Sequence, residues 1–298
     1  MSSNNHTHNR DLQQDARAWS AFTGSSYTAA LRQLESPLAL GIFEERVSAR
    51  NLIATLNDHP LIGGDRGASA LDQGDGVSQR FNGESDFLEL ALATDTLRMF
   101  TPIAAPGVSS RAFTRTAGYL LAQHCSGLTN EQIIWAAASI GLTIAPQVPS
   151  GTDFLIGVSD REYEYLQRMV TPGETRPQGN YNRPVGLCHL QRALRQHQLG
   201  EPIDYNWVRP FRTEPIGRDS YTVGGFGAGS GDFERYEYRC PCGGGEIIEE
   251  HDNVPGFREH DVRIDCDQCR SVWRFVDGRP TRDWALEPVS AAREAADM

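Results

Sequence analysis

Lysine is absent from this 298-residue chain, so all 28 basic residues are arginines. A Schiff base, a P-loop and a serine–lysine dyad each depend on a lysine amine. The sequence therefore excludes these chemistries and the covalent attachment of pyridoxal phosphate. This chain also lacks the lysine that one class of nucleases places beside two acidic residues in its active site.

Long apolar runs and an excess of positive charge are also missing. No stretch of about 18 apolar residues occurs, which argues against a membrane span. The formal net charge of −11 argues against a nonspecific nucleic-acid binder, since that role requires neutralisation of phosphates. Residues 1–23 are polar and contain no apolar segment typical of a signal peptide, so we expect a cytoplasmic protein with reduced thiols.

Four of the six cysteines occur as two tight pairs. Cys240-Pro-Cys242 is followed by three glycines, and 23 residues in all separate Cys242 from the second pair, Cys266-Asp-Gln-Cys269. Two cysteine pairs at turns, flanked by alternating apolar and polar residues, are what a tetrahedral Zn²⁺ requires. The first pair is one residue shorter than the usual spacing, and the glycines after it allow the tight turn. The sequence thus predicts a zinc ribbon with ligands Cys240, Cys242, Cys266 and Cys269.

The segment CPCGGGEIIEEHDNVPGFREHD, residues 240–261, resembles the zinc-ribbon segment of uncharacterised bacterial proteins. Residues 128–138 and 154–158 are similar to parts of hypothetical proteins from GC-rich bacteria. The resemblance implies a ribbon and brings no activity with it. Because the first pair departs from the ordinary ribbon pattern, His251 or His260 stays open as an alternative metal ligand.

The hydrophobic pattern predicts an α+β protein, with a mostly helical N-terminal region that contains a small strand pair. A C-terminal ribbon of short antiparallel strands is expected beyond it, with strands near 236–239, 246–250, 261–265 and 271–276. Thr129 with Gln132, and Ser159 with Glu162, have the spacing of helix capping boxes. The expected divisions are a disordered tail over 1–13, a helical domain over 14–200 with a mobile loop over 63–83, a Pro/Gly-rich linker over 201–232, the ribbon over 233–289 and a tail over 290–298.

Two further clusters contain residues suited to chemistry. Residues 249–252 (Glu-Glu-His-Asp) and 259–261 (Glu-His-Asp) could hold a second divalent cation or act as acid and base. The alternative, which we favour, is an acidic solvated loop of the ribbon. The other cluster combines His124 and Cys125 with Cys188 and His189, and His197 lies farther along. It could form a cysteine–histidine pair or a second metal site, although buried structural cysteines are the commoner case.

Three functions are compatible with these patterns. The favoured one is a zinc-stabilised, non-enzymatic interaction protein, an adaptor or regulatory component that presents an acidic ribbon surface to a protein partner. The second is a nucleic-acid-associated regulator that uses Arg270, Arg274, Arg279 and Arg282. The negative net charge of the chain disfavours this second function. The third is a metal-dependent hydrolase that uses the predicted loop with residues 249–252 and 259–261. No Walker A, G-x-S-x-G or H-E-x-x-H motif is present.

Overall fold

The computed structural model describes residues 3–43, 46–62, 81, 83–148, 152–177, 182–224, 230–253, 259–277 and 279–289. The chain forms two compact units: the first contains residues 1–176 and 186–207, and the second contains 177–185 and 208–298. Helices and antiparallel strands are both present, which confirms the α+β class. The loop predicted over 63–83 lies outside the described residues except for Phe81 and Gly83, and the tail predicted over 290–298 lies outside them entirely.

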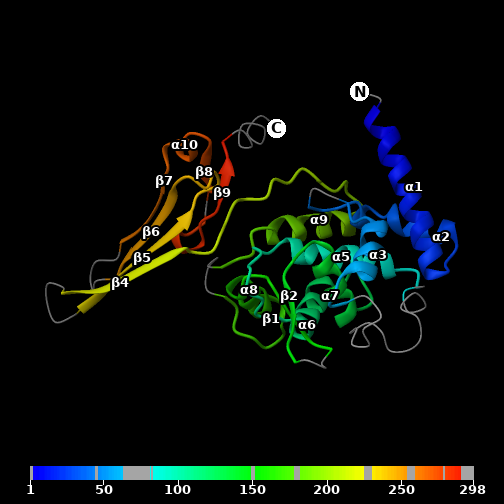
Figure 1. Ribbon diagram of the computed structural model, residues 1–298, viewed down its shortest axis with the longest axis horizontal. Coiled ribbons are helices and arrows are strands. Elements are labelled where there is room, and N and C mark those ends of the chain that lie inside the picture. Colours follow the sequence, from blue (N-terminus) through cyan, green and yellow to red (C-terminus); the bar gives the residue numbers. More distant parts are fainter. Residues whose placement is uncertain are drawn as a thin grey trace. The chain divides into compact units, whose positions relative to one another are not determined.

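The first unit is mainly helical (Figure 1). A three-stranded antiparallel sheet, in the order β1-β3-β2, accompanies the helices. Trp19, Phe87 and Trp135 are fully buried and pack ring against ring in the core. The elements are α1 (Ser3–Thr23), α2 (Tyr27–Leu34), a 3₁₀ turn (Pro37–Ala39), α3 (Ala49–Asp58), α5 (Asp86–Arg98), β1 (Val108–Ser109), α6 (Ser110–Leu121), α7 (Asn130–Ser139), β2 (Ile144–Pro146), β3 (Phe154–Ile156), α8 (Asp160–Val170) and α9 (Leu187–Leu199).

Helix α1 contradicts the predicted disordered tail over 1–13, because it begins at Ser3. Leu12, Ala16 and Trp19 recur at helical spacing on one buried face. At the edge of the same face the buried carboxylate of Asp15 accepts hydrogen bonds from residues at the start of α3. Polar composition suggested disorder, but these contacts to distant residues hold the helix against the rest of the unit.

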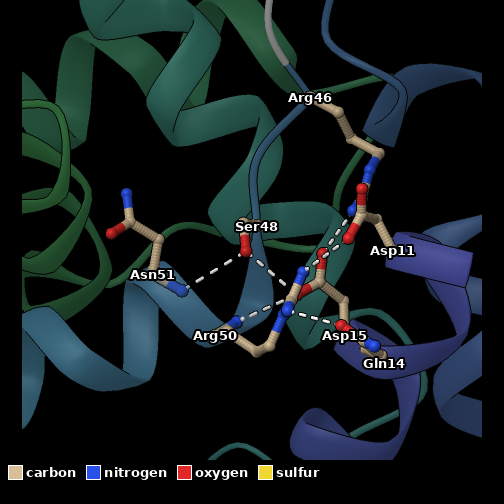
Figure 2. Close-up of polar contacts among 7 residues, drawn as sticks. All are labelled: Asp11, Gln14, Asp15, Arg46, Ser48, Arg50 and Asn51. Atoms are coloured by element: carbon tan, nitrogen blue, oxygen red, sulfur yellow. Dashed lines mark hydrogen bonds and ion pairs between the residues drawn. The ribbon is translucent and has the colours of Figure 1, made fainter. Parts of the chain in front are cut away.

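Asp15 joins α1 to the start of α3, as Figure 2 shows. Arg46 forms an ion pair with one of its oxygens. The hydroxyl of Ser48 donates to the other oxygen at 2.9 Å, and Arg50 donates to the same oxygen through its Nε at 2.8 Å. The side chain of Asp15 has no exposed surface, and these charge-assisted hydrogen bonds lower its pKa although burial alone would raise it.

The second unit is built on a four-stranded antiparallel sheet in the order β4-β5-β6-β7 (Figure 1). Strands β8 and β9 form a separate antiparallel pair. The small core of this unit contains Tyr238, Ile247, Trp284 and Leu286. The elements are β4 (Gly217–Gly224), β5 (Ser230–Arg239), β6 (Glu246–Asp252), β7 (Glu259–Asp265), α10 (Asp267–Arg270), β8 (Trp273–Phe275), a 3₁₀ turn (Thr281–Asp283) and β9 (Leu286–Pro288).

The predicted linker over 201–232 is wrong in its second half, because β4 and the start of β5 occupy it. Cross-strand contacts explain the pairing: Tyr221 stacks on Phe233 with ring centroids 4.8 Å apart, and Arg218 forms an ion pair with Glu234 at 2.9 Å. The glycine-rich run suggested a flexible tether. The strand β4 (Gly217–Gly224), most of which precedes that run, was therefore not predicted.

The second unit is discontinuous in sequence, which the predicted domain boundaries did not anticipate. Its segment 177–185 is separated from the remainder by residues 186–207 of the first unit. Arg279, whose side chain is 4% exposed, donates to the carbonyl of Arg183 at 2.9 Å and forms an ion pair with Asp283 at 2.8 Å. A buried guanidinium therefore ties the early segment to the late one.

Candidate metal centre

Four cysteines converge at one end of the sheet of the second unit. Cys240 follows the last residue of β5, and Cys242 lies in the turn that leads to β6. Cys266 directly follows β7, and Cys269 lies in α10. Both pairs thus sit where an antiparallel strand ends, so strand register brings together two segments that are 23 residues apart in the chain.

The sulfur atoms are grouped closely enough to share one ion. All four Sγ atoms lie within 4.8 Å of one another. The Sγ atoms of Cys240 and Cys242 are 3.2 Å apart, and those of Cys242 and Cys266 are 3.6 Å apart. Sulfurs at the corners of a tetrahedron, each about 2.3 Å from one Zn²⁺, are about 3.8 Å apart. The donor set therefore fits a tetrahedral metal ion.

The glycines after the first cysteine pair give the turn its shape. Gly243 has a φ of +74°, a backbone conformation that favours glycine. At Gly245 an added Cβ would lie 2.6 Å from Cβ and 3.0 Å from Sγ of Cys266. The amide of Gly245 donates to Sγ of Cys240 at 3.2 Å, and that of Gly244 donates to Sγ of Cys242 at 3.4 Å. The turn therefore supplies two amides to the sulfurs and leaves room for the second pair.

Burial and hydrogen bonding affect the thiols in opposite ways. Burial raises the pKa of Cys269 to about 12. The amide of Gly244, followed by the neighbouring thiols, lowers the pKa of Cys242 to about 7. All six cysteines are free thiols. Protons thus compete with a metal for these sulfurs, and a bound cation would favour the thiolate form at each of them.

His251 and His260 do not join the four cysteines. They face each other directly across β6 and β7, with their Nδ1 atoms 2.8 Å apart. Cys266 lies six positions beyond His260 in extended chain, which corresponds to roughly 20 Å along the strand. Among the described residues, the group that could hold an ion through three or more cysteine, histidine or acidic ligands contains the four cysteines alone.

The acidic residues predicted to form a loop lie on paired strands instead, which corrects that expectation. Strand β6 continues to Asp252 and β7 already begins at Glu259. Glu250 and Asp261 pair with Arg263, and Glu250 also pairs with Arg235. These carboxylates form a cross-strand ion-pair ladder, whereas Glu249 points away from it and hydrogen-bonds His251.

The second predicted cysteine–histidine cluster does not assemble. Cys125 donates weakly to the carbonyl of Leu121 at 3.7 Å, and burial raises its pKa to about 11. Cys188 is exposed. His189 is buried with its Nε2 2.9 Å from the carbonyl oxygen of Ile42, and burial lowers its pKa. His124 does approach His197, with ring centroids 6.1 Å apart. Neither cysteine is thus set up as an activated thiolate.

The four clustered arginines of the second unit are each paired with carboxylates. Ion pairing offsets the positive charge that a phosphate backbone would need. The pairs are Arg270 with Asp265 and Asp267, Arg274 with Glu287, Arg279 with Asp283, and Arg282 with Glu234.

A polar cleft in the first unit was missed by sequence reasoning. It has a volume of about 280 Å³ and lies between α3, α5 and α7, where Arg46 and Arg98 contribute to its walls. Each guanidinium is paired with a buried aspartate, Asp15 or Asp95. The lining residues come from three separate stretches of the chain, 46–52, 94–98 and 139–140, so no local motif could have revealed the cleft.

The described helices include none with the length and hydropathy needed to cross a bilayer. No family model, curated protein or solved structure matches the chain. The resemblance of residues 240–261 to bacterial zinc-ribbon segments therefore stays a prediction.

Proposed function

We propose that this protein is a zinc-stabilised, non-enzymatic interaction protein whose second unit is a zinc ribbon. The observation that carries this proposal is the grouping of Cys240, Cys242, Cys266 and Cys269, with all sulfurs within 4.8 Å. Four thiolates complete a tetrahedral zinc site and leave no open position for substrate or water, which is typical of structural zinc. The ion would hold the ends of β5, β6 and β7 in place.

The β4–β5 hairpin is the surface that would contact a partner. Tyr221 is 57% exposed and Ile216, just before β4, is 55% exposed. Asp219 and Asp232 are exposed on the same hairpin. Exposed aromatic and aliphatic side chains favour protein contacts. Together with a chain charge of −11, the surrounding acids favour a basic protein as the occupant.

The other two functions have less support. Carboxylate pairing of Arg270, Arg274, Arg279 and Arg282 weighs against a nucleic-acid-binding face. Pairing of Glu250 and Asp261 with arginine weighs against a hydrolytic centre on β6 and β7, since hydrolysis requires acids that are available to water and substrate.

Metal analysis tests the zinc part of the proposal. The purified full chain should contain one zinc per chain, and Cys266→Ser and Cys269→Ser should lower that content to well under half. Cys188→Ser removes an exposed thiol outside the cluster and serves as the matched control, which should keep its zinc. A wild-type chain that purifies in reducing buffer, folds and binds no added zinc would rule the proposal out.

Affinity capture tests the interaction part. A genuine partner should be retained by the zinc-loaded chain, should be basic, and should dissociate as salt rises. Tyr221→Ala should weaken capture, whereas Tyr119→Ala, which alters a 45% exposed tyrosine of the first unit, should not. Capture that is unchanged by Tyr221→Ala and by zinc removal would contradict the assignment of this surface.

A further inference from the structure

A histidine pair on the sheet of the second unit lies outside the cysteine cluster and brings two imidazole nitrogens together. His251 on β6 and His260 on β7 are directly opposite each other in the strand register. Their Nδ1 atoms are 2.8 Å apart and their ring centroids are 4.8 Å apart. His251 is fully buried and His260 is exposed, so the pair opens to solvent on one side.

A buried carboxylate fixes the orientation of the inner histidine. Oε1 of Glu249 lies 2.5 Å from Nε2 of His251, while Oε2 accepts hydrogen bonds from Tyr238 at 2.7 Å and Trp284 at 3.0 Å. Glu249 is 4% exposed. Although its burial raises the pKa, the hydrogen bonds from His251 and Tyr238 lower it, so the carboxylate stays ionised.

The ionised carboxylate decides which nitrogen of His251 carries hydrogen. Because Glu249 can only accept, the hydrogen of a neutral His251 resides on Nε2 and the lone pair of Nδ1 points at His260. A carboxylate behind one imidazole nitrogen, with the other nitrogen presented as a ligand, is the outer-shell arrangement found around protein-bound metals.

We propose that Nδ1 of His251 and Nδ1 of His260 bind a second divalent cation, with Glu249 as the positioning residue. An ion about 2.1 Å from both nitrogens, held at their 2.8 Å separation, would subtend an angle of roughly 85°. This angle is close to the 90° of octahedral or tetragonal coordination and far from the tetrahedral angle that zinc prefers.

The site therefore suits an ion of the Ni²⁺ type, with water in the remaining positions. On binding, the hydrogen that His260 carries on Nδ1 exchanges through solvent to its Nε2, so that both Nδ1 atoms present a lone pair and both rings stay neutral. The positive charge of the ion then faces the buried negative charge of Glu249. The competing possibility is a plain hydrogen bond between the imidazoles, which would bind no metal.

Titration of the zinc-loaded full chain with Ni²⁺ separates the two possibilities. Ni²⁺ is the probe because it does not oxidise the cysteine thiols as Cu²⁺ would. Calorimetry gives the stoichiometry, and zinc is measured in parallel so that replacement at the cysteines is detected. The wild type should bind one more Ni²⁺ per chain than His260→Gln, with zinc retained in both.

Two additional variants define the site. Glu249→Gln should weaken the binding of this Ni²⁺ by about 10- to 100-fold, because the amide no longer fixes His251 as an ionised carboxylate does. His197→Gln, which alters an exposed histidine of the first unit, should bind as much Ni²⁺ as the wild type. Equal Ni²⁺ binding by the wild type and by His260→Gln, or none by either, overturns the proposal and leaves the zinc proposal intact, since the zinc content is measured independently.

Discussion

Gly245 shows at the scale of one residue how the cysteine turn depends on the absence of a side chain. Gly245→Ala would place its Cβ 2.6 Å from Cβ of Cys266, whereas at the adjacent Gly244 an added Cβ meets only Sγ of Cys242 at 3.7 Å. We predict that Gly245→Ala lowers zinc affinity at least about tenfold, equivalent to ~1.4 kcal/mol. Competition with a chromophoric chelator measures this, and Gly244→Ala is the matched control.

Asp95 provides a prediction about pH at the same scale. Burial raises its pKa to about 6, although Arg98 and the amide of Ile42 contact the carboxylate. The folded chain therefore holds more protons than the unfolded chain between about pH 4 and 6. The contribution of Asp95 to stability is fully present below pH 4 and is lost as pH rises through 6, by roughly 3 kcal/mol at most.

Comparison of the wild type with Asp95→Asn isolates this effect. Denaturant unfolding across pH 4 to 8 should show the wild type losing stability relative to the variant up to about pH 6.5 and staying parallel to it above. A difference between the two proteins that is constant over the whole range would contradict the raised pKa.

The attachment of α1 to α3 is a prediction at the scale of elements. Asp15→Ala leaves Arg46, whose side chain is 11% exposed, without its carboxylate. Loss of one partner of a buried pair costs about 3–5 kcal/mol. Asp11→Ala removes a carboxylate that is 54% exposed and that forms an ion pair with Arg50 (Figure 2). This substitution should lower the free energy of unfolding by under about 1 kcal/mol. Chemical denaturation measures both, and equal losses would contradict the assigned role of Asp15.

Local signals in the sequence located many of the elements. The capping box of Thr129 and Gln132 is present at the start of α7, and Ser48 caps α3. Where a predicted local feature is absent, contacts with distant residues have replaced it. The capping box predicted from Ser159 and Glu162 does not form: Ser159 makes no capping hydrogen bond, and the carboxylate of Glu162 accepts from the amide and hydroxyl of Thr101 instead.

In the second unit, too, the sequence predicted what depends on local spacing and did not predict what depends on strand pairing. Cysteine spacing alone predicted which four sulfurs lie together, because metal-ligand spacing is local. The relation of His251 to His260 depends on strand register, since a shift of β7 by one residue against β6 would turn His260 to the other face of the sheet. Nothing in a single sequence specifies that register closely enough.

Removal of the proposed zinc ion provides a prediction for the whole molecule. Metal binding to a four-cysteine module contributes on the order of 10 kcal/mol to its folding. A chelator should therefore unfold the second unit and alter the near-ultraviolet signals of Trp273 and Trp284, which pack in or against its small core. The helices of the first unit contain no ligand of the cluster, so the far-ultraviolet helical signal should persist. Simultaneous loss of both signals would contradict this independence.

The interruption of the second unit by residues 186–207 limits how the gene can be divided. A fragment that starts at residue 208 lacks the carbonyl of Arg183 that receives a hydrogen bond from the buried guanidinium of Arg279. Such a fragment would carry all four cysteines and still miss part of its own interior. Recombination could therefore not transfer the cysteine-bearing unit as a single contiguous cassette, and an expression fragment of it should fuse 177–185 to the C-terminal stretch.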